Sequence, residues 1–254
     1  MNETPFLSLI IPAYNEGNRL PTTLPQVIAF AQAQPFPVEV IVVDNNSRDD
    51  TAAIATEFAA QFPFVHLLSE PIQGKGAAVR AGMAAACGNL LFMADADLSM
   101  PVEEVSKFLP PLGDGWDIAI ASREVKGAVR YNEPAYRHFM GRIFNFLVRA
   151  VAVRGFQDTQ CGFKCFRRDV LLDILPGQTI EGWAFDVELL HIAQKRGYLI
   201  TEVPIDWYYR HNSRVNPLRD SLTMLREVLR IRLNSWRGRY DPAPGHVRTL
   251  DPSG

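Results

Sequence analysis

Asp95 and Asp97 are the residues of this 254-residue chain whose type and spacing most directly indicate chemistry. They follow a short apolar run, and carboxylates two residues apart in an extended turn can converge on one hard cation. Mg²⁺ and Mn²⁺ prefer oxygen ligands and usually keep water and substrate phosphate oxygens in their coordination shell. The pair therefore predicts a divalent metal site that holds a diphosphate, with an ordinary helix cap as the alternative.

Polar residues also end two earlier apolar runs. Pro12-Ala13-Tyr14-Asn15-Glu16 follows the first run, and Asp44-Asn45-Asn46-Ser47 follows the second. Further along, Gly74-Lys75-Gly76 precedes a predicted helix, where glycines permit close backbone approach and a helix N-terminus favours anions. The spacing matches neither a P-loop nor a dinucleotide fingerprint, so this segment indicates either an anion site or an ordinary helix start.

The charges are divided unevenly between the two halves of the chain. Residues 1–122 contain five Lys and Arg against fourteen Asp and Glu, whereas residues 123–254 contain twenty-one against fourteen. This division predicts two kinds of partner, a cation and an anionic group or surface. Arginine binds phosphate in a bidentate way, and the candidates for binding a phosphate are Arg123, Arg130 and Arg137. Arg137 is equally compatible with a solvated helix face.

These residues must be positioned by alternating strands and helices. Apolar and β-branched runs predict strands over 6–11, 38–43, 64–68, 90–94 and 118–121, separated by helices over 20–34, 52–62 and 76–87. This rhythm is typical of an α/β fold with a doubly wound, mostly parallel sheet and helices on both faces. Such sheets bind ligands at the carboxyl ends of their strands, which is where the polar motifs lie.

The second half is less regular. Its patterns predict helices over 134–153, 188–196 and 218–236, and strands over 163–166 and 200–203. We expect one domain over residues 1–210, with a nucleotide-binding half (1–122) and an acceptor half (123–210). A helix over 211–239 and a disordered tail over 240–254 would follow it.

The C-terminal helix pattern bears on membranes. Residues 210–239 contain eight arginines and two acids, and apolar residues alternate with the arginines at helical spacing. This predicts an amphipathic helix on an anionic membrane surface, with a helix packed on the core as the alternative. We find no signal peptide and no unbroken apolar run of the ~18–20 residues that span a bilayer. We therefore expect peripheral binding at the cytoplasmic face of a membrane, and no nucleic-acid partner.

Composition limits the class of protein. The chain is 47% hydrophobic and 21% charged, which is ordinary for a globular protein and excludes disordered, collagen-like and coiled-coil classes. Three cysteines do not form a disulfide framework and indicate a reducing compartment.

Taken in order, the motifs resemble the inverting family 2 glycosyltransferases with the GT-A fold. Two later segments, Asp158-Thr159-Gln160-Cys161-Gly162-Phe163-Lys164 and Trp183-Ala184-Phe185-Asp186-Val187-Glu188, are similar to the dolichyl-phosphate β-glucosyltransferases. The resemblance covers roughly residues 6–235. It implies metal-dependent transfer of glucose from UDP-glucose to a polyprenyl phosphate, with Mg²⁺ or Mn²⁺ and with inversion at the sugar. The chain departs from the family pattern at Asn45-Asn46, at Pro71-Ile72-Gln73 and at Ser99.

The resemblance also implies roles for individual residues. Those expected around the nucleoside are Pro12, Ala13, Tyr14, Glu16 and Asp44, and those expected around the diphosphate, sugar and metal are Lys75, Asp95, Ala96 and Asp97. The catalytic candidates are Asp97, Arg123 and Asp186, and Gln160 and Trp183 are candidates for contact with sugar or acceptor. A phosphate monoester is largely dianionic at pH 7, since its second pKa is near ~6. Such an acceptor needs positioning and charge neutralisation more than deprotonation, so no residue is assigned firmly as a base. Asp186 and Glu188 lie where other members of the superfamily place one.

Other functions remain open. Within the family, the donor could be GDP-mannose or the acceptor a hydroxyl group. A sugar nucleotidyltransferase would need a Gly-rich stretch with Arg after the first strand, which Pro12-Ala13-Tyr14-Asn15-Glu16 excludes. A non-catalytic sugar-nucleotide-binding module is disfavoured by the intact Asp95 and Asp97.

Overall fold

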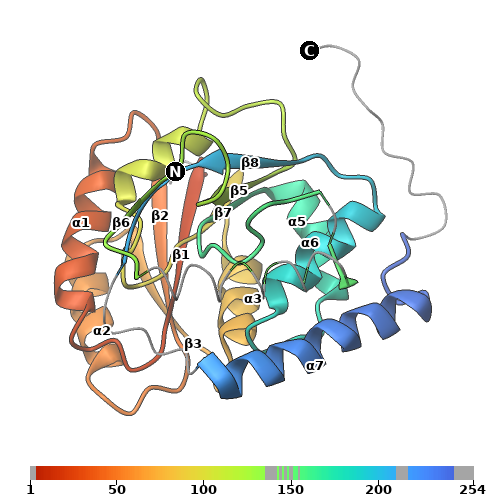
Figure 1. Cartoon of the computed structure of the whole chain (residues 1–254). Helices are drawn as coiled ribbons and strands as arrows, with labels where there is room; N and C mark the ends of the chain where they lie inside the picture. The colour runs from red at the N-terminus through yellow and green to blue at the C-terminus, as the bar shows by residue number, and fades with distance from the viewer. Residues whose placement is uncertain are drawn as a thin grey trace.

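A seven-stranded sheet forms the centre of the computed structural model, which describes residues 4–134, 142, 145, 148, 151–153, 155–209 and 217–242 (Figure 1). Its strand order is β3-β2-β1-β4-β7-β5-β8. The strands are β1 (Leu7–Ala13), β2 (Val38–Asp44), β3 (Val65–Ser69), β4 (Leu90–Met93), β5 (Ile118–Ser122), β7 (Lys164–Arg167) and β8 (Ile200–Pro204). β7 is antiparallel to both of its neighbours, and the other pairs are parallel.

Helices cover both faces of this sheet (Figure 1). One layer contains α1 (Leu20–Gln32), α2 (Thr51–Gln61) and the 3-10 helix η1 (Val102–Phe108). The other contains α3 (Lys75–Ala85), α5 (Arg168–Ile174), the short 3-10 turn η2 (Leu175–Gly177) and α6 (Phe185–Lys195). Helix α7 (Pro217–Trp236) packs along α6, and β6 (Val129–Tyr131) pairs with β9 (Asp206–Tyr208) in a separate two-stranded sheet.

Alternating side chains of the strands build one hydrophobic core on each face. On β1, Leu9 packs in the core shared with α1 and Ile10 in the core shared with α3, as the two-residue period of a strand requires. All seven residues of β2 are buried, as expected for a strand covered on both faces. A Cβ atom on Gly82 of α3 would lie 2.5 Å from the Ile10 side chain, so this glycine allows α3 to approach the sheet closely.

The predicted doubly wound, mostly parallel sheet is confirmed, with differences in detail. The strand predicted over 163–166 is β7, and the helix predicted over 188–196 begins earlier, at Phe185. The sequence patterns did not predict η1, α5, β6 or β9. The helix predicted over 134–153 lies mainly outside the described residues, as does the end of the tail. Within the described part of the chain, no helix combines the length and apolarity needed to cross a bilayer.

Candidate active site

The candidate residues gather where β1, β2, β4 and β5 end. Ala13 and Asp44 are register partners at the ends of β1 and β2, and β4 ends at Met93, two residues before Asp95. Because neighbouring parallel strands present their carboxyl ends at one edge, the polar segments after them converge there. The topology thus brings the carboxyl ends of β1, β2 and β4 to one edge of the sheet.

The loops after β1 and β2 are tied together by hydrogen bonds. The Asn15 amide donates to Ser47 Oγ (2.9 Å), the Arg48 amide donates to Asn15 Oδ1 (2.7 Å), and the Glu16 amide donates to Thr51 Oγ1 (2.7 Å). Asn15 has a φ of +51°, a left-handed conformation that asparagine adopts more readily than most residues. This network holds the segment that contains Tyr14 against the loop after Asp44.

Asp44 and Asn45 have different tasks at the end of β2. Asp44 is buried, and its Oδ1 atom has no hydrogen-bond partner in the described part of the chain. Asn45 donates to the Glu70 and Ile72 carbonyls (3.1 and 2.6 Å) and accepts from the Gly74 amide (2.7 Å). Asn45 therefore fixes the approach to α3, whereas Asp44 keeps an acceptor oxygen that a ligand donor can satisfy.

Lys75 and Asp95 form the ion pair at the centre of the site. Lys75 Nζ lies 2.5 Å from Asp95 Oδ1 and 5.7 Å from the centre of the Trp183 ring. Burial lowers the pKa of Lys75, but Asp95, Asp186 and Asp97 raise it more, so the pKa lies above its ordinary value. Lys75 therefore stays protonated as the cation among these three carboxylates.

The Asp95 and Asp97 carboxylates have closely packed surroundings. Asp97 Oδ1 accepts the Ser99 amide at 2.9 Å. A Cβ atom on Gly162 would lie 1.8 Å from Asp95 Oδ2, so only glycine fits beside this carboxylate. The described residues contain no group of three or more His, Cys, Asp or Glu side chains that could hold a metal ion. Two carboxylates fit a hard divalent cation whose remaining ligands come from diphosphate and water.

The start of α3 differs from the expected anion site. The amides of Gly76 and Ala77 donate to the Glu181 carbonyl at 2.8 and 3.2 Å, so these two donors are occupied by the protein itself. A Cβ atom on Gly74 would lie 2.2 Å from the same carbonyl oxygen. The glycines therefore allow the 180–182 segment to pack against α3, which favours the ordinary helix start that the sequence also left open.

Lys164 and Asp186 form a second, more deeply buried ion pair, which the sequence reasoning missed. The two atoms Lys164 Nζ and Asp186 Oδ2 are 3.0 Å apart, and Lys164 also donates to the Cys161 carbonyl at 2.5 Å. Lys164 is 1% exposed and Asp186 is 5% exposed. A lysine inside the apolar 163–166 run was the available signal, because lysine is rarely fully buried unless it is paired.

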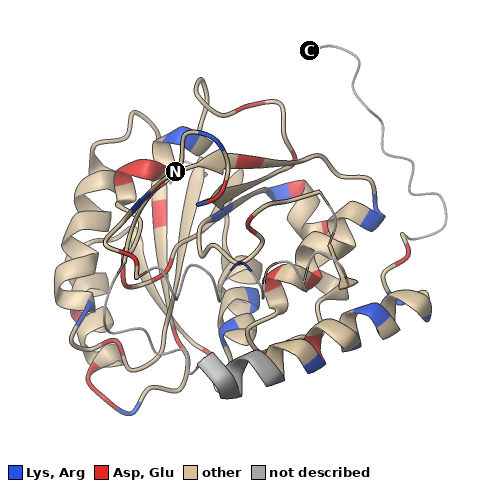
Figure 2. Cartoon of the chain, viewed as in Figure 1, with Lys and Arg blue, Asp and Glu red and all other residues tan. Residues whose placement is uncertain are grey.

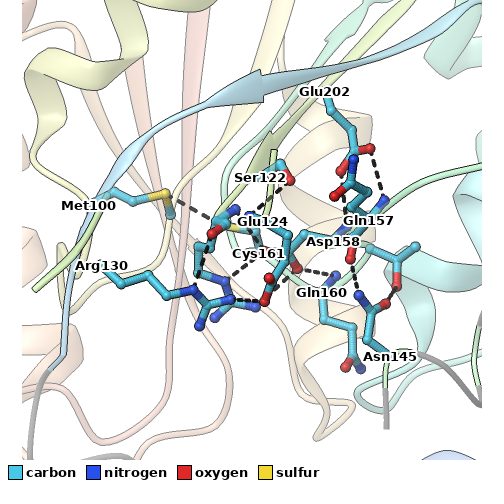
Figure 3. Close-up of polar contacts among 12 residues, drawn as sticks. Met100, Ser122, Glu124, Arg130, Asn145, Gln157, Asp158, Gln160, Cys161 and Glu202 are labelled. Atoms are coloured by element: carbon cyan, nitrogen blue, oxygen red, sulfur yellow. Dashed lines mark hydrogen bonds and ion pairs between the residues drawn. The ribbon is translucent and has the colours of Figure 1, made fainter. Parts of the chain in front are cut away.

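Arg123 is held by Asp158. Nε and Nη2 of Arg123 donate to the two carboxylate oxygens at 2.7 and 3.0 Å. Burial raises the pKa of Asp158, but Arg123 lowers it more, so the pKa lies below its ordinary value. Figure 3 shows the surrounding contacts, in which Glu202 accepts the Gln157 and Asp158 amides. Arg123 thus follows β5 as predicted, with an unpredicted carboxylate partner.

The remaining acceptor candidates differ in their surroundings. Arg130 is paired with Glu124 and donates to the Arg123 carbonyl (Figure 3). Glu133 is a second ion-pair partner of Arg130, and Arg137 lies outside the described residues. Gln160 contacts Met224 of α7.

Glu188 differs from Asp186 in its surroundings. Its carboxylate accepts the Thr179 and Ile180 amides at 2.8 and 2.7 Å and is also bound by the Thr179 and Tyr240 hydroxyl groups. These four donors surround a fully buried side chain, which assigns Glu188 to the structural framework.

Three ion pairs bring six charged side chains of the site together as opposite charges. Arg123 pairs with Asp158, Lys164 with Asp186, and Lys75 with Asp95. Such an arrangement can orient an anionic ligand while keeping each buried charge compensated.

Comparison with known proteins identifies the family of the chain. Residues 8–175 match the family model described as Glycosyl transferase family 2. A dolichyl-phosphate beta-glucosyltransferase of Trichomonas vaginalis is 37% identical over 80% of this chain and 64% of its own length. The human enzyme of that name is 33% identical over 92% of this chain and 77% of its own length. The chain therefore spans 64% and 77% of the length of these two relatives.

Solved structures share the fold. The structure of glucosyl-3-phosphoglycerate synthase from Mycobacterium tuberculosis with UDP has a TM-score of 0.64 at 22% identity, covering 96% of this chain and 83% of that chain. Mannosyl-3-phosphoglycerate synthase from Rubrobacter xylanophilus has a TM-score of 0.66 at 19% identity, covering 95% and 78%. The sheet and helices therefore form a GT-A fold, and the chain belongs to glycosyl transferase family 2.

Proposed function

We propose that this enzyme transfers glucose from UDP-glucose to a polyprenyl phosphate of the dolichyl type. The relatives that carry the name dolichyl-phosphate beta-glucosyltransferase, between 37% and 30% identical to this chain, support the acceptor and the sugar. The M. tuberculosis synthase crystallised with Mn²⁺ and UDP-glucose supports the donor and a divalent metal.

The state of Asp186 is the observation that carries this proposal. An alcohol acceptor needs a base in the transition state, and Asp186 is the carboxylate that the family pattern offers for that role. Here Asp186 is buried, and both of its carboxylate oxygens already have donors: Oδ2 binds the Lys164 ammonium at 3.0 Å, and Oδ1 accepts the Val187 amide at 2.8 Å. A phosphate acceptor needs positioning and charge neutralisation instead of deprotonation. The paired Asp186 therefore favours a phosphate over an alcohol.

The charged residues divide the reaction between them. Residues 1–122 bind the donor, with Pro12, Ala13, Tyr14, Glu16 and Asp44 around the nucleoside and Lys75, Asp95, Ala96 and Asp97 around the diphosphate and sugar. Residues 123–210 bind the acceptor phosphate through Arg123, with Arg130 and Arg137 as further candidates. Gln160 and Trp183 are the candidates for contact with the sugar or the acceptor. Asp158 uses Nε and Nη2 of Arg123, which leaves Nη1 for a phosphate oxygen.

Transfer is a single displacement in this proposal. An oxygen of the acceptor phosphate forms the bond to C1 of glucose while the bond from C1 to the UDP oxygen breaks, and that electron pair leaves with UDP. No proton has to move. Attack opposite the leaving group converts the α-linked donor into a β-linked product. When Mg²⁺ or Mn²⁺ is bound by Asp95 and Asp97, it supplies positive charge for the departing diphosphate, and Lys75 supplies more.

Because the acceptor carries a lipid chain, the enzyme must work at a membrane surface. We propose peripheral binding at the cytoplasmic face, consistent with three unpaired cysteines.

An acceptor comparison tests this function. Purified enzyme with Mn²⁺ and labelled UDP-glucose is offered a polyprenyl phosphate or the matching polyprenol, and the label in the organic phase is counted. We expect labelling of the phosphate and none of the alcohol. Asp97→Asn should abolish transfer, whereas Asp114→Asn, at an exposed carboxylate paired with Arg167, should preserve it. Comparable labelling of the polyprenol would refute the phosphate acceptor.

A further inference from the structure

The side of α7 that faces away from α6 combines large apolar and basic side chains. Leu229, Leu233 and Trp236 are 54%, 42% and 74% exposed, a high exposure for three large hydrophobic residues on one helix. Arg226 and Arg230 are exposed arginines of the helix, and Arg237, also exposed, follows directly after its end. Figure 2 shows basic residues recurring along this helix. These six residues are called the outer face of α7 below.

The outer face is divided lengthwise into two strips. Successive residues of an α-helix are rotated by about 100° around the helix axis. Viewed along this axis, the three apolar side chains therefore lie within a sector of about 60°, and the three arginines lie within an adjacent sector of about 40°. Arg232 lies on the other side of the apolar strip, with its guanidinium 5.5 Å from the centre of the Trp236 ring. The apolar strip is therefore bordered by arginine on both sides.

The opposite side of α7 is fixed to the protein. Val228 and Ile231 are buried in the core that includes α6, and Glu227 accepts the Ala184 amide at 2.9 Å. Glu227 is the one acid in the sequence between residues 223 and 237, and it faces inward. The outer face thus has no negative charge of its own in this stretch, and the fold does not use its apolar side chains.

We infer that the outer face of α7 docks on the surface of an anionic lipid bilayer. Leucine and tryptophan side chains enter the interfacial region of a bilayer, and flanking arginines bind lipid phosphates beside them. Each arginine adds attraction to anionic lipid. A second copy of the chain would bring arginines against arginines, and nucleic acid would leave the leucines and tryptophan unexplained. Charge and apolarity together therefore favour lipid.

This docking would place the active site beside the membrane. The inner side of α7 contacts Gln160 through Met224 and the Trp183-Ala184 segment through Glu227, so the helix borders the proposed acceptor half. The value of docking for catalysis rests on the proposed function, but the docking itself does not.

Vesicle sedimentation without nucleotide or polyprenyl phosphate tests the inference independently of catalysis. The vesicles contain phosphatidylcholine alone, or phosphatidylcholine and phosphatidylglycerol in equal parts. We expect wild-type protein to sediment with the mixed vesicles and much less with the neutral ones. The triple change Arg226→Gln, Arg230→Gln, Arg237→Gln should weaken this binding on the order of 100-fold.

A matched pair of variants isolates the apolar strip. Leu229→Ser with Leu233→Ser should weaken vesicle binding at least ~10-fold, whereas Leu172→Ser with Leu199→Ser, two leucines each 50% exposed elsewhere, should bind as wild type. Blue-shifted Trp236 fluorescence on binding, absent in Trp236→Phe, gives a second readout. Equal binding by all variants, no binding by wild type, or a dimer that the α7 changes dissociate would overturn the inference.

Discussion

The buried pair between Lys164 and Asp186 provides the sharpest quantitative prediction. Lys164 is 1% exposed, Asp186 is 5% exposed, and their charged atoms are 3.0 Å apart. Removing one partner from such a pair leaves a buried charge without compensation, which destabilises proteins by about 3–5 kcal/mol. We therefore expect Lys164→Met and Asp186→Asn each to lower the free energy of unfolding by about that amount.

The double variant should be less damaging than the sum of the single variants. With both charges removed, no uncompensated ion remains in the core, so the coupling free energy should reach about 2–3 kcal/mol, the upper range for contacting residues. The assay is equilibrium unfolding in urea at pH 7, followed by circular dichroism, with the four proteins compared under the same conditions.

A surface pair is the matched control. Arg167 Nη2 lies 3.1 Å from Asp114 Oδ1, and the two side chains are 47% and 66% exposed. The corresponding cycle with Arg167→Met and Asp114→Asn should give a coupling below about 1 kcal/mol. If the effects at Lys164 and Asp186 instead add within about 0.5 kcal/mol, the two residues are independent. Lys164 would then not engage Asp186, and the preference for a phosphate over an alcohol acceptor would lose its structural support.

Three further predictions follow from the local surroundings of single residues. Arg123 holds the pKa of Asp158 below its ordinary value, so this carboxylate stabilises the fold above its unfolded pKa near ~3.9 and loses that contribution as the pH falls. Asp158→Asn should therefore lower the urea midpoint at pH 7, and the midpoint of this variant should fall less steeply than that of wild type as the pH is lowered. Thiol titration at pH 8 should modify Cys87, which is exposed, and spare the two buried cysteines, because burial raises the pKa of Cys161 to about 11; reaction of more than one thiol in the native protein would contradict this. Gly74→Ala should lower both the melting temperature and the affinity for UDP, because the new Cβ atom would lie 2.2 Å from the Glu181 carbonyl oxygen. The control is Gly155→Ala, where φ is +93° and no atom lies within 4 Å, and its cost should be only about 1–2 kcal/mol of backbone strain.

Local sequence patterns predicted the elements whose signals are local. The β-branched run of β2 and the acidic residues after β1, β2 and β4 were sufficient to predict the sheet and the edge where the site lies. The placement of β7 was not predictable in this way, because insertion of an antiparallel strand between β4 and β5 depends on pairing between distant segments. Lys164 was missed for the same reason, since its partner Asp186 is 22 residues away.

Two site interpretations also required tertiary structure. Arg123 was correctly placed after the fifth predicted strand, but Asp158, 35 residues later, determines how its guanidinium is oriented. The glycines around Lys75 were compatible with either an anion site or an ordinary helix start, whereas the Glu181 carbonyl occupies the amides of Gly76 and Ala77. Packing between α3 and the segment before α6 has no signature in either segment alone.

A donor comparison tests the central claim most directly. Enzyme, Mn²⁺ and a short polyprenyl phosphate are incubated with labelled UDP-glucose, UDP-galactose, UDP-N-acetylglucosamine or GDP-mannose in separate reactions, and label is measured in the organic phase. We predict transfer from UDP-glucose, its loss in Asp97→Asn, and a β-linked glucosyl phosphate as the product. Transfer from GDP-mannose alone would contradict the donor, and absence of lipid labelling with every donor would contradict the polyprenyl-phosphate acceptor.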